Sequence, residues 1–484
     1  MSALDGLRPE NVFHYFELLS SVPHGSGNTK QISDLCVDFA VSHGLEHYQD
    51  SANNIIIIKE ATEGYECSEP VILQGHLDMV CVKDENIDID MKTEPIRLMH
   101  DDEWVFADRT SLGGDNAIGV AMIMAILDDD SLSHPRIEAV FTTDEETGMD
   151  GAVALDVSHL KAKMMINLDS EHEGVITAGC AGGARVDCTF PLSASNIPHN
   201  YICLRSEISG LLGGHSGIEI NKGHGNAIVL MGRYIQRIRT RVTEKLMLVS
   251  LSGGKFDNVI PKASESVFAI PESEFHSFKA ETEAFINDIS KELSSTDPGF
   301  SMKTDSCECG YMAISEELSE KIVNSLIIMP FGVQSMSADI SGLVQSSLNM
   351  GVAKIGLQSV CFSFSVRSSI KSEKEYIIDR IAAIMKSLGG NATVRNAYPG
   401  WEFQKHSPLR EIVAESCEKI LKKPVKITAT HGGLECGMFM EKITGLDCVS
   451  IGPDLFEVHS TSEKLSIDST KHIYDIICDT LKNL

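Results

Sequence analysis

The segment Thr143-Asp144-Glu145-Glu146-Thr147-Gly148 places two consecutive glutamates directly after an apolar run, residues 137–141. The apolar run predicts a buried strand, and neighbouring side chains point to opposite sides of a strand. Glu145 and Glu146 could therefore serve one centre in two ways, with one binding a metal and the other transferring a proton. A solvated acidic turn is the commoner explanation of any single stretch of this kind, so the chemistry depends on partners elsewhere in the chain.

A histidine and an aspartate follow another predicted strand. Residues 71–73 are apolar, and His76 and Asp78 come just after them in the segment Gly75-His76-Leu77-Asp78. The i, i+2 spacing puts both side chains on one face of an extended chain. A metal-bound imidazole usually has its second ring nitrogen held by a carboxylate or a carbonyl, and Asp78 is placed to do this.

Three further residues of metal-ligand type occupy similar positions. Asp169 ends the apolar run 164–168, His459 follows residues 448–451, and Asp115 precedes a small, apolar helical run. Parallel α/β sheets place their chemistry at strand ends. Two histidines, two terminal carboxylates and one shared aspartate fit a pair of zinc ions, each with three protein ligands and an open position.

The 13 cysteines do not suggest a structural metal site or a disulfide framework. They are scattered and include no CxxC pair. This distribution is typical of a chain with free thiols in a reducing cytosol.

The motifs resemble those of the dinuclear zinc exopeptidases and, within that superfamily, those of the aminoacylhistidine dipeptidases (Xaa-His dipeptidases, or peptidase D). The resemblance extends over nearly the whole chain. The last of the motifs that carry it is specific to this branch. In order they are Gly75-His76-Leu77-Asp78-Met79-Val80, Leu112-Gly113-Gly114-Asp115-Asn116, Thr143-Asp144-Glu145-Glu146-Thr147-Gly148, Asn167-Leu168-Asp169-Ser170-Glu171 and His431-Gly432-Gly433-Leu434-Glu435-Cys436-Gly437.

The resemblance implies a role for each candidate ligand. His76 and Asp169 would bind one zinc ion, Glu146 and His459 would bind the other, and Asp115 would bridge the two. Manganese or cobalt could occupy the same histidine and carboxylate ligands.

The resemblance also implies the catalytic roles. Asp78 would orient His76, and Glu145 would be the general base for a water held between the two metals. The expected reaction is metal-dependent hydrolysis of dipeptides, Xaa-His dipeptides included, by a metalloprotease. The peptide bond between Asp115 and Asn116 is expected to be cis, as is frequent after the bridging acid in this superfamily.

Length, composition and charge agree with a metabolic enzyme. The chain has 484 residues, enough for two or more domains, and 43% of them are hydrophobic without an unbroken run that could span a bilayer. The formal charge of −28, from 41 basic and 69 acidic residues, argues against nucleic acid or an anionic membrane as a partner. The first ten residues lack the features of a signal peptide, so we expect a cytoplasmic protein.

The order of predicted elements indicates an α/β fold with a discontinuous catalytic domain. Strands and helices alternate in residues 1–183, which predicts a mostly parallel sheet, and this pattern resumes in residues 398–484. Residues 184–397 form an inserted α/β lid. A strand–helix–strand order occurs twice in the lid, which predicts two related lobes, about 184–305 and 306–397.

The lid carries candidates for substrate binding. His215 lies in a glycine-rich loop, Asn258 lies beside a turn, and Arg367 ends a predicted strand. Each is more often a structural residue when taken alone, but the resemblance favours a function. His215 would stabilise the oxyanion, and Arg367 would bind the substrate carboxylate. Outside the lid, Glu435 would bind the free amine.

Two alternatives stay open at this level. A related amidohydrolase would act on N-acyl amino acids and would not need to bind a free amine. A non-catalytic binding protein is disfavoured because all five ligand candidates and the base are present. The sequence does not decide which dipeptides are preferred, or whether the chain forms a homodimer.

Overall fold

A computed structural model describes residues 3–484, which form two compact units. Unit 1 comprises the chain up to Cys180 together with Phe403–Ala429 and Leu434–Leu484. Unit 2 comprises Ala181–Glu402 and the short segment Thr430–Gly433. The predicted catalytic and lid domains change at 183/184 and 397/398, within a few residues of these divisions.

Unit 1 is built on an eight-stranded mixed sheet with a parallel centre. The four central strands run parallel in the order β6 (Ile137–Thr142), β3 (Val71–His76), β7 (Met164–Asn167) and β23 (Asp447–Ser450). The outer strands are β1 (Glu46–Gln49) and β2 (Ile55–Lys59) on one side, and β8 (Val175–Cys180) and β22 (Lys426–Thr430) on the other. Strands β3 and β6 are buried along their whole length, as expected for parallel strands covered on both faces.

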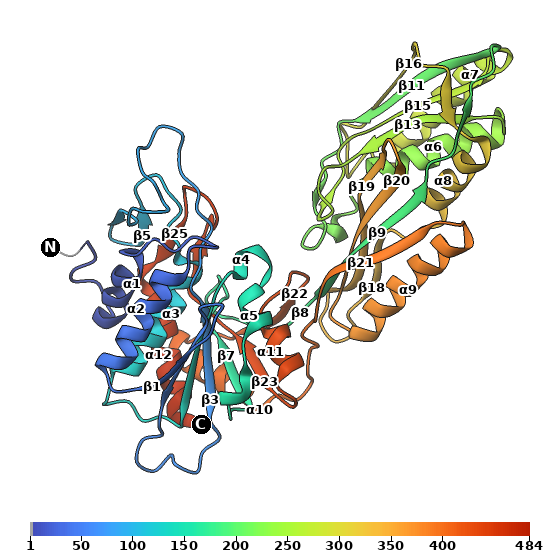
Figure 1. The fold of residues 1–484 in the computed structure, drawn as a ribbon. Coiled ribbons are helices and arrows are strands. Elements are labelled where there is room, and N and C mark those ends of the chain that lie inside the picture. Colours follow the sequence, from blue (N-terminus) through green and yellow to red (C-terminus); the bar gives the residue numbers. More distant parts are fainter. Residues whose placement is uncertain (1–2) are drawn as a thin grey trace. The chain divides into compact units, whose positions relative to one another are not determined.

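The helices of unit 1 lie on both faces of this sheet (Figure 1). One large core contains residues of α1 (Glu10–Ser20), α2 (Lys30–Ser42), α3 (Gly114–Asp128), α10 (Pro408–Leu421) and α12 (Ile467–Asn483). The short helices α5 (Asp150–Ala154) and α11 (Cys436–Lys442) lie on the other face. Helix α3 is apolar all round and buried from Asn116 onward, which makes it the central helix of the core.

A second, four-stranded sheet lies beside this core in unit 1. Its order is β24 (Leu455–Phe456), β25 (Lys464–Ser466), β5 (Trp104–Ala107) and β4 (Leu98–His100). Strands β24 and β25 form a hairpin whose loop carries His459. The hairpin pairs with β5, so the C-terminal loop that carries His459 is attached to the N-terminal half of the chain.

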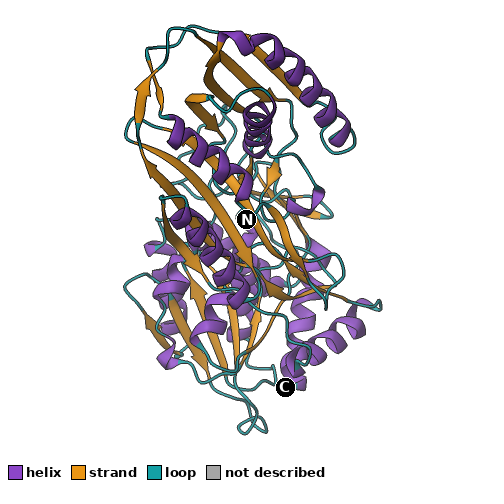
Figure 2. Ribbon diagram, turned by 90° about the vertical axis from the view of Figure 1, so that its right-hand side faces the viewer, coloured by secondary structure: helices purple, strands orange, loops and turns teal. Residues whose placement is uncertain are grey.

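Unit 2 contains a nine-stranded sheet whose described pairs are antiparallel. Along the sheet the strands are β16 (Ser301–Ser306), β11 (Tyr201–Ser209), β15 (Ser264–Pro271), β13 (Met247–Gly253), β19 (Val344–Ile355), β20 (Ser359–Ser368), β9 (Gly182–Pro191) and β21 (Asn391–Tyr398), with β18 (Gly332–Met336) paired to β19. Helices α6 (Ala227–Arg241), α7 (Phe275–Glu292), α8 (Glu316–Ile328) and α9 (Lys371–Ser387) pack on one face (Figures 1 and 2).

The predicted internal repeat corresponds to two observed strand–helix–strand segments. They are β15-α7-β16 and β20-α9-β21. Both segments belong to one continuous sheet, because β13 pairs with β19 across the middle. Strand β9 precedes the first segment in the chain but pairs with both strands of the second, so the two predicted lobes are halves of one layer rather than separate bodies.

One disulfide, between Cys203 and Cys309 in unit 2, differs from the expectation of free thiols. The two cysteines are 106 residues apart, and Cys203 lies in β11 while Cys309 follows β16. Their pairing depends on β11 and β16 lying next to each other, which the spacing of the cysteines in the sequence does not reveal.

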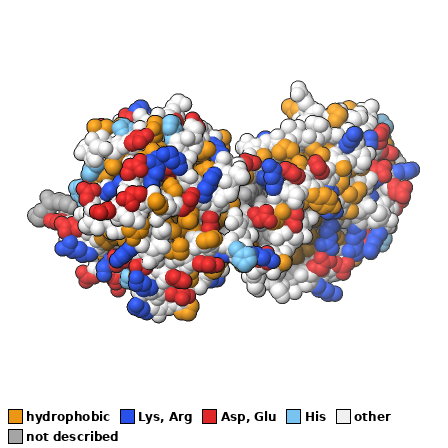
Figure 3. All heavy atoms as spheres, turned by 90° about the horizontal axis from the view of Figure 1, so that it is seen from below, with side chains coloured by type: hydrophobic (Ala, Val, Ile, Leu, Met, Phe, Trp, Pro, Cys, Tyr) orange, Lys and Arg blue, Asp and Glu red, His pale blue; other side chains and the backbone are white. Residues whose placement is uncertain are grey.

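The surface is mixed in charge, and acidic and basic side chains are interspersed over the face drawn in Figure 3. Among residues 3–484, none of the helices combines the length and the apolar composition that crossing a membrane requires.

Candidate active site

Three parallel strands of unit 1 end at the same edge of the sheet and deliver four candidate residues there. Strand β3 ends at His76, β6 is followed by Glu145 and Glu146, and β7 is followed by Asp169. His76 is paired in register with Thr142, the last residue of β6. The polar side chains therefore gather at the carboxyl edge, where open α/β sheets bind ligands.

Asp115 reaches this edge from the start of helix α3. The Asn116 side chain donates a hydrogen bond of 2.5 Å to the carbonyl of Leu168, next to Asp169. A methyl group on Gly75 would lie 2.4 Å from the Asn116 side-chain oxygen, so glycine at position 75 allows α3 to approach β3 closely. The peptide bond between Asp115 and Asn116 is cis, as expected.

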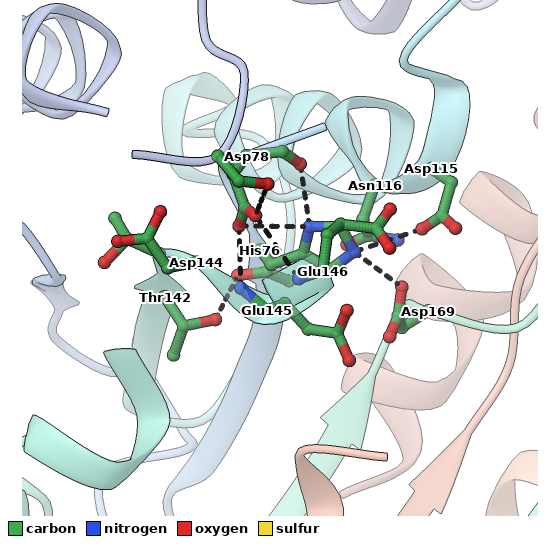
Figure 4. Close-up of polar contacts among 12 residues, drawn as sticks. His76, Asp78, Asp115, Asn116, Thr142, Asp144, Glu145, Glu146 and Asp169 are labelled. Carbon is green, nitrogen blue, oxygen red and sulfur yellow. Dashed lines mark hydrogen bonds and ion pairs between the residues drawn. The ribbon is translucent and has the colours of Figure 1, made fainter. Parts of the chain in front are cut away.

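The five predicted metal ligands converge around Asp115. His76 Nε2 lies 3.1 Å from Asp115 Oδ1 and 3.2 Å from Asp169 Oδ1. His459 Nε2 lies 3.3 Å from Asp115 Oδ2 and 2.8 Å from Glu146 Oε1. Each oxygen of Asp115 thus faces a different histidine, and each histidine faces a different second carboxylate. Figure 4 shows His76 among these acidic side chains.

This donor set fits metal cations. One ligand atom each from His76, Asp115 and Glu146 lie within 4.8 Å of one another. Burial opposes a charge on His76, but the carboxylates of Asp169 and Asp115 raise the pKa of His76 well above its usual value. Hydrogen bonds to Asp115 and Glu146 raise the pKa of His459 to about 10. The site therefore favours positive charge strongly, and imidazole with carboxylate is a ligand set suited to zinc.

Asp78 contacts His76 differently from the expectation. The Nδ1 atom of His76 lies 2.9 Å from the backbone carbonyl of Asp78, whereas the nearest carboxylate oxygen of Asp78 is 3.7 Å away. The carboxylate instead accepts hydrogen bonds from the backbone N–H groups of Glu145 and Glu146 and from the Ser26 hydroxyl. Asp78 thus holds His76 through its main chain and the start of α4 (Glu145–Gly148) through its side chain.

Glu145 and Glu146 point in different directions from the start of α4 (Figure 4). Glu146 meets His459, whereas no protein group within residues 3–484 forms a hydrogen bond with the Glu145 carboxylate. Burial raises the pKa of Glu145 to about 8; nearby His76 opposes this rise, and the neighbouring carboxylates add to it. A carboxylate with a raised pKa and no fixed partner can accept and release a proton near neutral pH.

Glu435 lies behind the strand ends and is fully buried. One of its carboxylate oxygens accepts hydrogen bonds of 2.6 Å from Gln74 and 2.7 Å from Thr142, and the other has no partner among the described residues. Gln74 also accepts a hydrogen bond from Asn167. Burial raises the pKa of Glu435 to about 7. Sequence reasoning missed Gln74 and Thr142 because they lie inside strands that predict only core.

Unit 2 contains the other predicted substrate-binding residues, His215, Asn258 and Arg367. His215 lies in β12 (Gly214–His215), which pairs with β14 (Val259–Ile260), next to Asn258. The backbone N–H groups of Gly217 and Ile218 donate to Nδ1 of His215 at 3.3 and 3.2 Å. Because Nδ1 is the acceptor, the proton of neutral His215 lies on Nε2, which is left as a donor. Burial and the charge of Arg367 lower the pKa of His215, which keeps it neutral.

Arg367 lies near His215 without a carboxylate partner among the described residues. Its Nη1 atom donates to the Tyr398 hydroxyl at 3.3 Å and to the His431 carbonyl at 3.4 Å, and its Nε–H has no partner among residues 3–484. A methyl group on Gly217 would lie 3.0 Å from the His215 ring and 3.2 Å from the Arg367 guanidinium. Glycine at position 217 therefore leaves room for the His215 ring and the Arg367 guanidinium to lie close to each other.

Two further residues surround this group in unit 2, and sequence reasoning did not single them out. His431 is bonded through Nε2 to the Ser347 hydroxyl at 2.7 Å, and burial with the charge of Arg367 lowers the pKa of His431 to about 3. Arg185 forms an ion pair of 3.0 Å with Asp257. His431 opens the last motif quoted above, so its position was visible, but its neutral, buried state was not.

Comparison with known proteins identifies the family of this chain. Residues 72–483 match the model of the peptidase family M20/M25/M40. The chain belongs to this family. It is 34% identical to the cytosol non-specific dipeptidase of Escherichia coli (strain K12) over 484 residues, which cover 100% of this chain and 99% of the relative. The predicted resemblance is thereby confirmed.

Solved structures give the same result. The aminoacylhistidine dipeptidase from Vibrio alginolyticus superposes with a TM-score of 0.94 at 32% identity, covering 99% of this chain and 98% of that one. The aminopeptidase PepT from Bacillus cereus, at 17% identity and a TM-score of 0.55 over 98% of both chains, shares the fold. The expected fold class, a mixed α/β protein with a mostly parallel sheet, is confirmed.

Proposed function

We propose that this protein is a metal-dependent dipeptidase that hydrolyses dipeptides with a free amine and a free carboxylate, Xaa-His dipeptides included. The observation that carries the proposal is the position of Asp115, whose two oxygens face two different histidines. Membership of the M20/M25/M40 family and the dipeptidase names of two full-length relatives support it.

Two zinc ions are the proposed cofactors, and manganese or cobalt would suit the same ligands. His76 and Asp169 would hold one ion, Glu146 and His459 the other, and Asp115 both. When bound, such ions act as Lewis acids and lower the pKa of the attacking water.

Glu145 is the proposed general base. It accepts a proton from the attacking water, and it returns the proton to the amine that leaves as the peptide bond breaks. Its half-buried carboxylate has no hydrogen-bond partner among the described residues, so it can move a proton without first breaking a hydrogen bond. Asp78 supports this role by holding the backbone of both Glu145 and Glu146.

The residues of unit 2 would bind the carboxyl half of the dipeptide. Arg367 offers a free Nε–H and a planar guanidinium, which suits a carboxylate. His215 would donate its Nε2–H to the carbonyl oxygen as negative charge develops there. The Asn258 side chain would add a neutral hydrogen bond to the same substrate.

Glu435 would select substrates with a free amino group. Its unpartnered oxygen can accept a hydrogen bond from an ammonium group, directly or through a water molecule. An N-acyl amino acid has no such ammonium, so the same carboxylate would be left buried and unsatisfied. This distinction separates the dipeptidase from an amidohydrolase acting on N-acyl amino acids.

A panel of dipeptides and N-acetyl amino acids, assayed with purified protein and added zinc, tests the proposal. We expect turnover of free dipeptides, loss of turnover after chelation, and recovery when zinc is restored. Preference for N-acetyl amino acids would instead establish the amidohydrolase. We also propose a cytoplasmic location, which the name of the E. coli relative supports. Gel filtration with light scattering would show whether the chain forms a homodimer.

A further inference from the structure

Glu463 is a buried carboxylate in unit 1 that the proposed reaction does not use. Its side chain is 2% exposed, and it lies in the β24–β25 loop four residues after His459. One carboxylate oxygen accepts hydrogen bonds from the backbone N–H groups of Leu112 at 2.9 Å and Gly113 at 3.3 Å. The other accepts from the N–H of Gly114 at 2.8 Å.

These three N–H groups immediately precede Asp115, in the loop that leads into helix α3. The backbone at Asp115 and Asn116 is not yet helical, so the N–H groups before them are loop groups. A buried backbone N–H needs a hydrogen-bond partner. In this protein the partner comes from 349 residues away, on the loop that carries His459.

The His459 loop needs such an anchor more than the other ligand segments do. Glu457 and His459 both have positive φ angles, 53° and 60°, a conformation that costs free energy and persists only when the surrounding structure holds it. The His459 side chain is 44% exposed. His76, in contrast, is 1% exposed at the end of a central strand.

We propose that Glu463 is a positioning residue that holds the His459 loop against the Asp115 loop and thereby sets the affinity of the metal site formed by His459, Glu146 and Asp115. The inference rests on the proposed metal ligands. Glu463 acts through backbone groups and touches neither substrate nor metal. Its loss should therefore affect one of the two metal sites more than the other.

The test is a titration of metal-free, full-length protein with Co²⁺, followed by its visible absorption and by calorimetry. In Glu463→Gln, the amide oxygen can accept hydrogen bonds on one side only, and on the other side the NH2 group faces a backbone N–H donor. We expect one of two binding steps to weaken by roughly ten- to a hundredfold, the size usual for the loss of a group that supports a metal ligand. The other step should keep its affinity.

Glu138→Gln is the matched control. Glu138 is also a fully buried glutamate of unit 1 that accepts backbone N–H groups, those of Lys161 and Ala162, but it lies at the opposite end of β6 from the ligands. This variant should be destabilised without a change in either binding step. His459→Ala should remove the same step that Glu463→Gln weakens, and combining the two should leave the remaining step unchanged.

The proposal is overturned if Glu463→Gln binds both ions as the wild type does, or if both steps weaken equally. Glu463→Asp keeps the charge with a shorter reach, and an intermediate loss confined to the same step would support the proposal even if the glutamine variant does not fold. A wild type that binds two ions but cleaves no dipeptide would refute the proposed function and leave this inference standing.

Discussion

The candidate-site histidines of the two units differ in the direction of their pKa shifts. In unit 1, carboxylates raise the pKa values of His76 and His459 above the usual value, in the case of His459 to about 10. In unit 2, burial and Arg367 lower the pKa values of His215 and His431, in the case of His431 to about 3. The same side chain thus lies among acids in one unit and beside an arginine in the other.

This contrast separates two kinds of binding. The acidic group of unit 1 is short of positive charge, which metal ions would provide. The group in unit 2 has an arginine that lacks a carboxylate partner within residues 3–484, together with neutral histidines that can donate, so its chemistry suits an anion. The proposed substrate carries a peptide bond and a carboxylate, which correspond to these two chemistries. Substitutions confined to one unit should therefore change either metal-dependent catalysis or anion binding, but not both.

Glu145→Gln should have the largest effect. It removes the proposed proton carrier from unit 1 but leaves the ligands in place, so kcat should fall by about 10²–10⁴-fold while metal content stays unchanged. Steady-state kinetics together with metal analysis by mass spectrometry measures both quantities. Glu146→Gln is the matched control, since it should lose metal as well. Loss of one ion per chain in Glu145→Gln would mean that the two glutamates have exchanged roles.

Arg367→Ala should have the next largest effect, and it should weaken substrate binding by unit 2 while leaving the metal-ligand residues of unit 1 intact. Loss of a charge-assisted hydrogen bond should lower kcat/KM by about ten- to a hundredfold, mainly through KM, because the arginine belongs to unit 2 and not to the metal-ligand group. Metal content should not change. Arg205→Ala, on the exposed side of β11, serves as the control.

A dipeptide with an amidated carboxyl end sharpens this result. It should be a poor substrate for the wild type and insensitive to Arg367→Ala, because it lacks the charge that Arg367 is proposed to bind. If the wild type cleaved the amide as well as the free acid, Arg367 would not be the carboxylate-binding residue.

His431→Gln should change how stability depends on pH. The folded pKa of His431 is about 3 and the unfolded value is about 6.5, so between these values the unfolded chain binds a proton that the folded one does not. The free energy of unfolding should therefore fall with falling pH, by up to about 1.4 kcal/mol per pH unit from this residue. Glutamine can still accept the Ser347 hydrogen bond, and it removes this contribution.

Urea unfolding of metal-free protein at about pH 6 and about pH 5 measures the difference, with the exposed His14→Gln as the control.

In unit 1, the free energy of unfolding should depend on pH in the opposite direction. The folded pKa of His459 is about 10, so in metal-free protein His459 contributes stability that is complete below about pH 6.5 and is lost as the pH rises toward 10. An equal acid sensitivity of His431→Gln and the wild type would show that His431 is already protonated in the fold.

The strand ends that carry the candidate site residues were predictable because local patterns determine them. The apolar runs that end near His76, Glu145 and Asp169 predicted β3, β6 and β7 to within a few residues, and these residues were singled out by their position after each run. What the sequence did not reveal are contacts between distant segments. The Asp78 carboxylate accepts a hydrogen bond from the backbone N–H of Glu145, which lies 67 residues further along the chain, and not from His76. The Glu463 carboxylate accepts one from Gly114, which is 349 residues away in the sequence. No spacing rule predicts such pairs, because they depend on how the sheet and its loops pack.

Asn258→Ala should have the smallest effect. It tests whether Asn258 contributes to substrate binding together with His215 and Arg367. The Asn258 backbone carbonyl accepts a hydrogen bond from the Ser216 N–H, and this bond survives the substitution. Only the side-chain amide is lost, so kcat/KM should fall by a few-fold to about tenfold, the value of one neutral hydrogen bond of about 0.5–1.5 kcal/mol. Asn258→Asp introduces a negative charge in the same part of unit 2. For a free dipeptide, its kcat/KM should be lower than that of Asn258→Ala, whereas for the amidated dipeptide the two variants should be similar. If alanine and aspartate were equally active on the free dipeptide, Asn258 would lie outside the carboxylate-binding group.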